Sequence, residues 1–288
     1  MLKFLTLCIS GVMLGCIYGL IALGYGLIYK ASGLMSFVQG DMLTLGAFLG
    51  LTYWLSLLLT MLCAFAFGML LEKGVIRRLL NKKVMPIYVV LATIAISYIL
   101  QKGSQLIWGT WTLNFPSVFK ASTVKLFGLL AVQPEVILCL ILSMVSMVVL
   151  HLFMNKTKLG TAMRASSMDS MAAESCGINV SLTTGITWGV SAMLAAMAGI
   201  LIGPMYGVYS SLGANLGNKG FDGAIHIAGG YGNMYGAIVG GILLGLLEIL
   251  VSGYVSSAYK NLIAYVALLL FLCIKPTGLF NERAIQDV

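Results

Sequence analysis

FLTLCISGVMLGCIYGLIALGYGLIY, the stretch from Phe4 to Tyr29, is apolar throughout and contains no charged residue. A helix needs roughly 20 such residues to cross the hydrocarbon layer of a membrane, so this stretch is long enough to span it. It is too long for the apolar region of a cleavable signal peptide, and no A-x-A cleavage site ends it. We therefore expect a retained membrane-spanning helix here.

Composition extends this interpretation to the whole chain. Of the 288 residues, 60% are hydrophobic and 9% are charged, whereas a soluble domain carries about 25% charged residues. Most of the outer surface must therefore face lipid. The expected fold class is an all-α polytopic transmembrane bundle of roughly eight spans with broken or re-entrant helices, formed by residues 1–288 as a single domain.

Further apolar runs mark the other spans. The run Met42–Leu71 is long for one helix and short for two, so we expect two short or tilted helices hinged near Ser56. The glycine-containing stretches Lys30–Gly40 and Pro204–Tyr235 predict interrupted helices, which are tolerated at membrane depth only when they are buried in protein or line a cavity. The remaining expected spans are Ile87–Leu106, Glu135–Phe153, Ser181–Ile202, Ala237–Tyr254 and Leu262–Ile274.

The net charge of +8 has a simple explanation in a membrane protein. The cations gather in short loops between apolar runs, which is the positive-inside pattern and not the pattern of a nucleic-acid-binding surface. We therefore expect the loops Glu72–Lys83 and Asn155–Asn179 in the cytoplasm and the segment Trp111–Pro134 outside it.

Several chemistries lack support in the sequence. The six cysteines form no CxxC pair and lie mostly in apolar runs, so they are interpreted as packing residues and not as disulfides or metal ligands. No Walker A motif is present, so the chain cannot hydrolyse ATP by that route. No nucleophile–base pair or metal-ligand cluster indicates an intramembrane enzyme. We expect a protein that is not an enzyme and that binds no cofactor or metal.

Glycine recurs at every fourth position in three runs. This spacing places each set on one helix face, where two backbones can approach closely. Tight internal packing is the first interpretation, and packing at a moving or dimeric interface is the second. The first two runs open comparable halves of the chain, which is typical of an internal repeat. The runs are Gly11, Gly15 and Gly19; Gly199, Gly203 and Gly207; and Gly232, Gly236 and Gly240.

Few ionisable residues lie near membrane depth, and they are candidates for a translocation pathway. Each costs ~2.5–3.5 kcal/mol at a helix centre unless it faces protein or water. The alternative is a structural hydrogen bond inside the bundle. Asp222 and His226 are four residues apart and can share a helix face. A metal site there would need a third ligand, and none is evident in the sequence. The pathway set consists of the ionisable residues Asp41, Asp222, His226 and Glu248, together with the polar residue Gln39.

The expected cytoplasmic loop contains the segment GTAMRASSMDSMAAESCGIN, residues 160–179. It predicts one short helix, Met163–Cys176, with Asp169 near its N-terminal end and Gly177 as its stop. Such a helix can lie on the membrane surface or dock into a groove on a partner protein. The segment carries few cations, which argues against strong lipid binding.

This segment resembles the cytoplasmic coupling loop of ATP-binding cassette (ABC) importer permeases, and in particular that of branched-chain amino acid permeases. The family loop opens with G-R-A-x-R-A and closes with A-A-x-x-x-G-I-N, and Thr161 replaces its first arginine. The coupling residues matched within 155–179 are Gly160, Arg164, Ala165, Asp169, Ala172, Ala173, Gly177, Ile178 and Asn179.

Three further motifs of that family follow in order, so the resemblance covers nearly the whole chain. SGLMSFVQGDMLTLGA, residues 32–47, is similar to N-F-A-H-G-D…L-G-A, with Ser36 and Gln39 in place of Asn and His. Lys219 and Phe221 open a K-A-F…G-G-x-G pattern, and residues 275–280, KPTGLF, resemble the P-T-G-L-F ending. Two departures are Asp222 and His226, where the family usually has small or apolar residues, and the Met42–Leu71 region is shortened.

The resemblance implies a permease subunit of an ABC importer in the bacterial inner (plasma) membrane. Its expected solutes are amino acids, branched-chain ones in particular, or similar small polar molecules. The implied partners are two ATP-binding subunits, a second permease subunit in a heterodimer or homodimer, an extracytoplasmic solute-binding protein and the lipid bilayer, with no nucleic acid. ATP and Mg would belong to the partner ATPase.

Two other functions remain open at the level of sequence. One is a permease of the same superfamily for simple sugars, urea or amides. The other is an ion-coupled secondary transporter in which Asp222, His226 or Glu248 relays protons.

Overall fold

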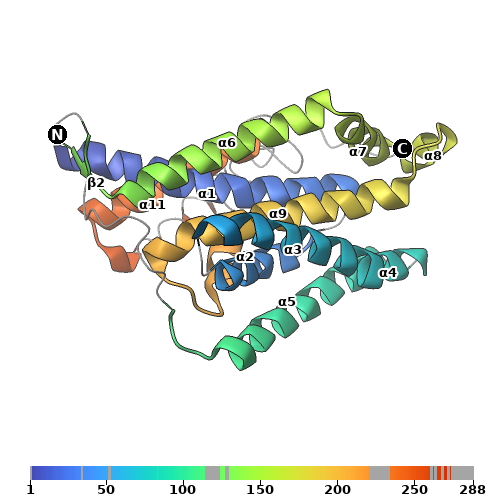
Figure 1. Cartoon of the computed structure of the whole chain (residues 1–288), viewed down its shortest axis with the longest axis horizontal. Coiled ribbons are helices and arrows are strands. Elements are labelled where there is room, and N and C mark those ends of the chain that lie inside the picture. Colours follow the sequence, from blue (N-terminus) through green and yellow to red (C-terminus); the bar gives the residue numbers. More distant parts are fainter. Residues whose placement is uncertain are drawn as a thin grey trace.

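A computed structural model describes residues 2–33, 35–50, 53–82, 84–113, 124–126, 130–220 and 234–259, with six further residues between 262 and 273. Within this part of the chain, six helices are long and apolar enough to cross a membrane (Figure 1). They are α1 (Leu2–Ser32), α3 (Tyr53–Leu71), α5 (Pro86–Trp108), α6 (Pro134–Lys156), α9 (Val180–Tyr206) and α11 (Met234–Tyr254). The predicted all-α polytopic bundle is confirmed, while the expected span Leu262–Ile274 lies mostly outside the described residues.

Shorter elements lie at the two ends of this bundle. The elements that carry the basic loops lie together at one end, whereas a two-stranded antiparallel ribbon lies at the other (Figure 1). The first group contains the π-helical turn η1 (Glu72–Ile76), α4 (Arg77–Asn81), α7 (Lys158–Met168) and α8 (Ser170–Ser175). The ribbon pairs β1 (Val124–Leu126) with β2 (Leu130–Val132), and a 3-10 turn, η3 (Ser257–Tyr259), follows α11.

The run Met42–Leu71 belongs to two helices, as expected, but the break lies earlier than Ser56. The first helix, α2 (Val38–Leu49), ends at Gly50, and α3 begins at Tyr53. Glycine is among the poorest helix formers, whereas serine continues a helix at a smaller cost. The chain therefore breaks at the glycine.

Two buried helices are too short to cross a membrane. The twelve residues of α2 extend ~18 Å and the eight residues of α10 (Leu212–Lys219) ~12 Å, against ~30 Å of hydrocarbon. Each follows a long helix that ends next to a glycine with positive φ, which is 66° at Gly33 and 70° at Gly207. The interruptions expected after α1 and α9 are therefore present in the described residues.

These pairs of helices repeat one pattern in opposite directions. In both halves a long helix (α1 or α9) is followed by a short buried one (α2 or α10), and α1 and α9 run antiparallel (Figure 1). The third helix of each half packs on the first helix of the other half. Thus α3 of the first half contacts α9, and α11 of the second half contacts α1. This is the arrangement of an inverted repeat, in which a solute pathway lies between the halves.

Glycine makes both of these helix contacts possible. A Cβ atom at Gly15 of α1 would lie 2.5 Å from the Cα of Ile242 in α11, and one at Gly241 of α11 would lie 2.5 Å from the backbone nitrogen of Gly19. In the other pair, a Cβ at Gly68 of α3 would lie 2.6 Å from the carbonyl oxygen of Trp188 in α9. Only glycine allows the backbones to approach this closely.

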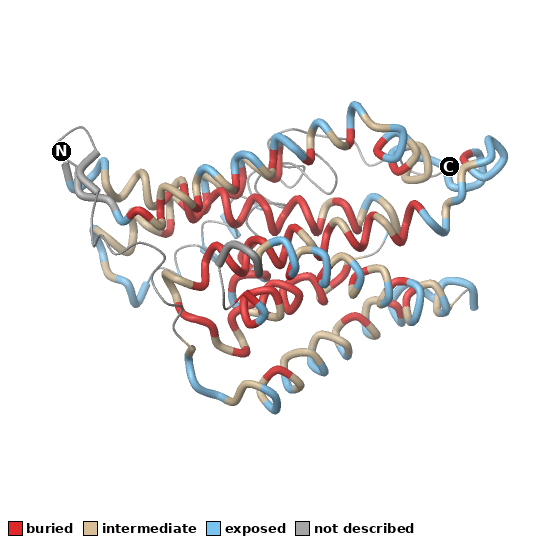
Figure 2. Tube along the Cα trace, viewed as in Figure 1, coloured by how far each residue is buried: buried red, intermediate tan, exposed pale blue. Residues whose placement is uncertain are grey.

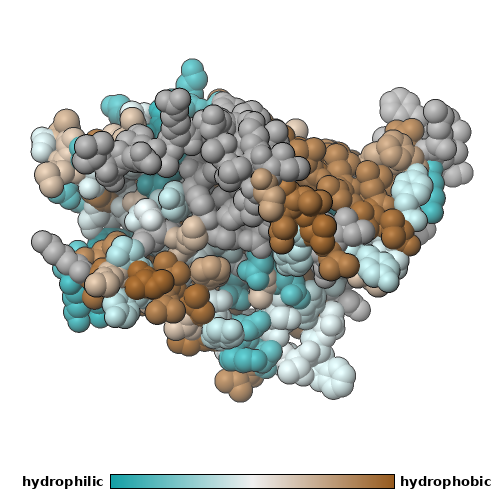
Figure 3. Space-filling model, turned by 180° about the vertical axis from the view of Figure 1, so that it is seen from behind, coloured by the Kyte–Doolittle hydropathy of each residue, from teal (hydrophilic) through white to brown (hydrophobic). Residues whose placement is uncertain are grey.

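Burial follows from this arrangement. The central helices α1 and α9 are buried along most of their length, whereas α5 and α6 lie on the outside and alternate exposed with half-buried and buried residues (Figure 2). Apolar side chains cover broad parts of the outer surface (Figure 3), and Leu58, Ile99 and Leu106 are among the exposed ones. An apolar exterior around a buried core that includes polar groups is the pattern of a protein in lipid.

Candidate functional site

Gln39 joins three helices in the interior. Its side chain is buried in α2, where its Nε2 donates to the Ser191 carbonyl oxygen of α9 at 2.8 Å. The Ser191 hydroxyl lies 2.9 Å from the Gln39 Oε1 and 2.7 Å from the carbonyl oxygen of Gly24 in α1. The predicted pathway residue Gln39 is therefore held in a fixed network between the two halves of the repeat.

Asp41 lies two residues further along α2, so it points away from Gln39 and faces α5. The Ser97 hydroxyl donates to its Oδ2, whereas its buried Oδ1 has no hydrogen-bond partner among the described residues. One turn earlier on α5, the Thr93 hydroxyl oxygen accepts a hydrogen bond from the Phe37 backbone N–H at 3.3 Å. These two contacts attach the peripheral helix α5 to the start of α2.

Glu248 forms a buried ion pair that sequence reasoning did not predict. The Lys219 Nζ at the end of α10 donates to the Glu248 Oε1 at 2.8 Å, and the Tyr18 hydroxyl of α1 donates to the Glu248 Oε2 at 2.7 Å. All three side chains are buried. A lysine and a glutamate at membrane depth each need a partner. Lys219 is a solitary lysine in a segment with few charges, and this was the feature of the sequence that could have indicated the pair.

The two short helices meet inside the bundle. The Gly213 backbone N–H of α10 donates to the Thr44 hydroxyl oxygen of α2 at 2.8 Å. A Cβ atom at Gly40 would lie 2.5 Å from the carbonyl oxygen of Gly213 and 3.4 Å from the Cα of Gly217. The halves of the repeat are therefore in backbone contact next to Gln39 and Asp41.

The segment expected to form one helix, Met163–Cys176, forms two, and Asp169 lies at the N-terminal end of the second one, in agreement with its expected place at a helix start. Asp169 is the break: its backbone is extended, at φ −150° and ψ 109°, and it caps α8. Its Oδ1 accepts hydrogen bonds from the backbone N–H groups of Met171 and Ala172, at 2.9 and 3.0 Å. Aspartate is a favoured N-cap residue because its side chain accepts hydrogen bonds from the free N–H groups of a helix start. The segment therefore forms two helices and not one.

The predicted stop at Gly177 has the expected geometry. Gly177 has a φ of 81°, and its N–H donates to the Glu174 carbonyl oxygen at 2.9 Å. The Ile178 N–H donates to the Ala173 carbonyl oxygen at 3.0 Å, which completes a Schellman motif. Two residues later, Asn179 caps α9 through a 3.0 Å bond from the Leu182 N–H to its Oδ1.

The α7–α8 segment presents apolar side chains at the end of the bundle. Met168 and Met171 are 81% and 78% exposed on either side of Asp169, and Ala172 is exposed as well. Ala173 and Met163, by contrast, are buried within the chain. Of the neighbouring alanines Ala172 and Ala173, therefore, only Ala172 is available to a partner.

The other matched loop residues shape the turn between α6 and α7. A Cβ at Gly160 would lie 2.6 Å from the Cα of Met154, so α7 folds closely back on α6. The Arg164 Nη1 donates to the Asn155 Oδ1 at 2.9 Å, which joins the two helices on their exposed side. Ala165 lies on α7 between these contacts and Asp169.

The glycines predicted for helix packing are placed as follows. A Cβ at Gly11 would lie 3.0 Å from the Cα of Leu246, and Gly199 packs against the Leu43 backbone of α2. Gly203, Gly236 and Gly240 are buried. The α11 glycines against α1 are Gly241 and Gly245, one position away from the predicted face. Gly232, Asp222 and His226 lie outside the described residues, and within the described ranges no three metal-binding side chains cluster.

Short helices that stop inside a membrane bundle are stable only where protein buries their ends or they line a cavity. In this chain the two short helices α2 and α10 come from the opposed halves of an inverted repeat and meet inside the bundle. This arrangement is typical of polytopic membrane transporters, and we place the chain in that class.

The comparisons with known proteins narrow the class to a family. The family profile described as branched-chain amino acid transport system / permease component matches residues 7–272. The chain therefore belongs to this family of permease components, and with six apolar helices in its described part it is a multi-pass protein of the inner membrane.

Individual relatives match over almost their full length. The high-affinity branched-chain amino acid transport system permease protein LivH of Escherichia coli K12 is 29% identical, with 100% of this chain and 98% of the relative covered. LivH of Salmonella typhimurium is similar to the same extent, and BraD of Pseudomonas aeruginosa is 30% identical over 99% of this chain and 98% of its own length. No solved structure matches the chain.

Proposed function

We propose that this chain is the permease subunit of an ABC importer that carries branched-chain amino acids, or similar small polar solutes, into the cell. The chain itself is a transport component and not an enzyme, and ATP and Mg would be bound by two partner ATPase subunits. A second permease subunit and an extracytoplasmic solute-binding protein would complete the transporter.

The observation that carries the proposal is the α7–α8 segment. It is short, capped at both ends of α8 and exposed, with Met168 and Met171 flanking Asp169. It contains few cations for binding lipid headgroups, so a groove on a partner protein suits it better than the membrane surface. Its position at the basic end of the bundle agrees with a cytoplasmic ATPase as that partner (Figure 1).

The pathway would lie between the halves of the repeat, close to Gln39 and Asp41. Asp41 supports this placement because one of its oxygens is buried without a partner in the described part of the chain. Glu248 is instead neutralised by Lys219, which agrees better with the structural alternative considered for it than with contact to solute.

Ala172 provides the direct test of ATPase docking. Ala172→Arg places a long cation on the exposed side of α8, so ATP-driven leucine uptake should fall at least tenfold while the amount of inserted protein stays normal. Thr161→Arg is the matched control, because Thr161 is exposed on α7 of the same loop and the family pattern has arginine there. Normal uptake by Ala172→Arg would refute docking at α8.

A further inference from the structure

A buried glutamate lies where α3 passes into its π-helical turn. Glu72 is 2% exposed and accepts two hydrogen bonds from Arg77, from Nε to Oε1 at 3.0 Å and from Nη2 to Oε2 at 2.6 Å. In an α-helix, residues five positions apart point in different directions, but the Arg77 N–H here bonds to the Glu72 carbonyl oxygen as in a π-turn. The wider turn brings the two side chains onto one face.

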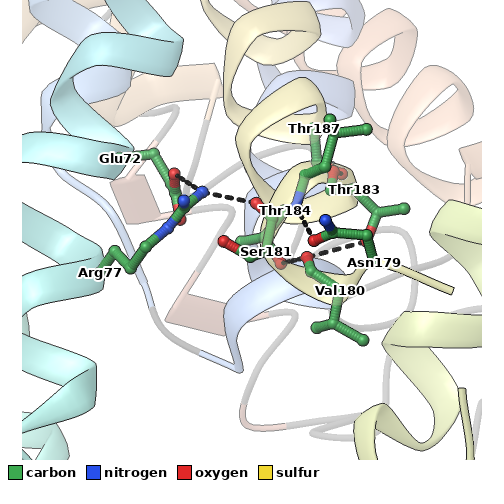
Figure 4. Close-up of polar contacts among 9 residues, drawn as sticks. Glu72, Arg77, Asn179, Val180, Ser181, Thr183, Thr184 and Thr187 are labelled. Carbon is green, nitrogen blue, oxygen red and sulfur yellow. Dashed lines mark hydrogen bonds and ion pairs between the residues drawn. The ribbon is translucent and has the colours of Figure 1, made fainter. Parts of the chain in front are cut away.

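The same arginine reaches the start of α9. Its Nη2 donates to the Ser181 carbonyl oxygen at 2.5 Å, so one guanidinium connects the end of α3 with the first turn of α9 (Figure 4). Gly185, one turn further along α9, leaves room for the pair. A Cβ there would lie 3.3 Å from the Glu72 Oε2 and 3.5 Å from the Arg77 Nη2.

This contact lies close to the α7–α8 segment. Only residues 176–179 separate α8 from α9, and they are fixed by the Gly177 stop and the Asn179 cap. Figure 4 shows Asn179 and Ser181 on the same end of α9, with the Glu72–Arg77 pair beside them. A displacement of α8 is therefore transmitted directly to the first turn of α9, where Arg77 binds.

Glycines let α3 and α9 approach closely, as at Gly68 against Trp188, and the clamp adds a polar contact at the end of this packed interface. A guanidinium that donates to a buried carboxylate and to a backbone carbonyl is directional, so it holds one axial register. An ordinary surface ion pair would not do this, but Glu72 is buried.

We propose that Glu72, Arg77 and the Ser181 carbonyl form a clamp that transmits movement of the α7–α8 segment to α3, with Glu72 and Arg77 as positioning residues for transport. The inference rests on the proposed function, since it assigns the clamp to the coupling between an ATPase at α8 and the spans. With the clamp broken, α8 and α9 move with the ATPase while α3 lags behind. ATP is then hydrolysed without transport.

The test uses the complete transporter, with its ATPase, second permease subunit and binding protein, reconstituted in vesicles. The measured quantity is the number of leucine molecules imported per ATP hydrolysed. Arg77→Lys keeps the charge but lacks the planar fork, so this ratio should fall about fivefold or more while ATPase activity is retained. Arg78→Lys, at the exposed neighbouring arginine of α4, should leave the ratio unchanged.

Gly185→Ala gives a second test that does not alter a charge. The added methyl group would lie 3.3 Å from the Glu72 Oε2, so the carboxylate must shift by a small distance and the ratio should fall in the same direction, by less than in Arg77→Lys. An unchanged ratio in Arg77→Lys and Gly185→Ala, or a parallel loss of ATPase activity and uptake that follows the amount of folded protein, would overturn the clamp. Absence of ATP-dependent uptake in the unmodified transporter would instead overturn the proposed function itself.

Discussion

At the scale of single residues, the most consequential group is the buried pair of Lys219 and Glu248. Glu248→Gln leaves the Lys219 ammonium without its counter-charge at membrane depth, and removing one partner of a buried pair costs about 3–5 kcal/mol. We expect a clearly lower melting temperature for the purified protein in detergent. Tyr18→Phe removes one hydrogen bond to the same carboxylate and should cost less, about 1.5–3 kcal/mol.

The double variant Lys219→Met/Glu248→Gln shows whether the loss comes from the unpaired charge. Because it removes both charges, its melting temperature should recover toward that of the unmodified protein. A double variant no more stable than Glu248→Gln alone would show that the ion pair is not the cause.

At the scale of elements, the contact between α1 and α11 depends on individual glycines. Gly15→Ala would place a methyl group 2.5 Å from the Ile242 Cα, which is backbone and cannot rotate away, so the helices must separate. We expect destabilisation by about 1–3 kcal/mol, measured as a lower melting temperature. Gly26→Ala on the same helix meets nothing within 4 Å and should be neutral or slightly stabilising. Equal effects of the two substitutions would contradict the close contact.

The cap of α8 gives a separate prediction. Asp169→Ala removes the acceptor for the Met171 and Ala172 N–H groups and should destabilise this six-residue helix by about 0.5–2 kcal/mol. Amide hydrogen exchange at residues 171–176 should therefore become several-fold faster, because local opening costs less. Asp169→Asn keeps a capping oxygen and should exchange nearly as slowly as the unmodified protein. Unchanged exchange in Asp169→Ala would show that the cap does not hold α8.

These elements also show what the sequence can predict. Long apolar runs and loop cations predicted α1, α5, α6 and α9 to within a few residues, because the membrane permits little else. The split of the α7–α8 segment was missed because a capping aspartate and an aspartate on a continuous helix give the same pattern. The Lys219–Glu248 pair and the clamp were missed because each joins helices whose neighbours only the tertiary fold determines.

At the scale of the whole molecule, the inverted repeat determines which helices of the two halves pack together. The short helices α2 and α10 meet inside, α11 packs on α1, and α3 packs on α9 and is clamped to its first turn. The exposed α7–α8 segment lies directly before α9, which is the most deeply buried of the six apolar helices that the structure describes. A force applied at that segment therefore reaches the centre of the bundle through one continuous helix.

Whether the chain is a permease subunit of an ABC importer is tested most directly by measuring the energy source of transport. The complete transporter is reconstituted in vesicles, and uptake of labelled leucine is followed with and without ATP at the ATPase side and with and without a proton ionophore. For an ABC importer we expect uptake that requires ATP and the solute-binding protein and that persists with the ionophore. Uptake that proceeds without ATP and stops when the proton gradient is dissipated would contradict it and would identify an ion-coupled carrier.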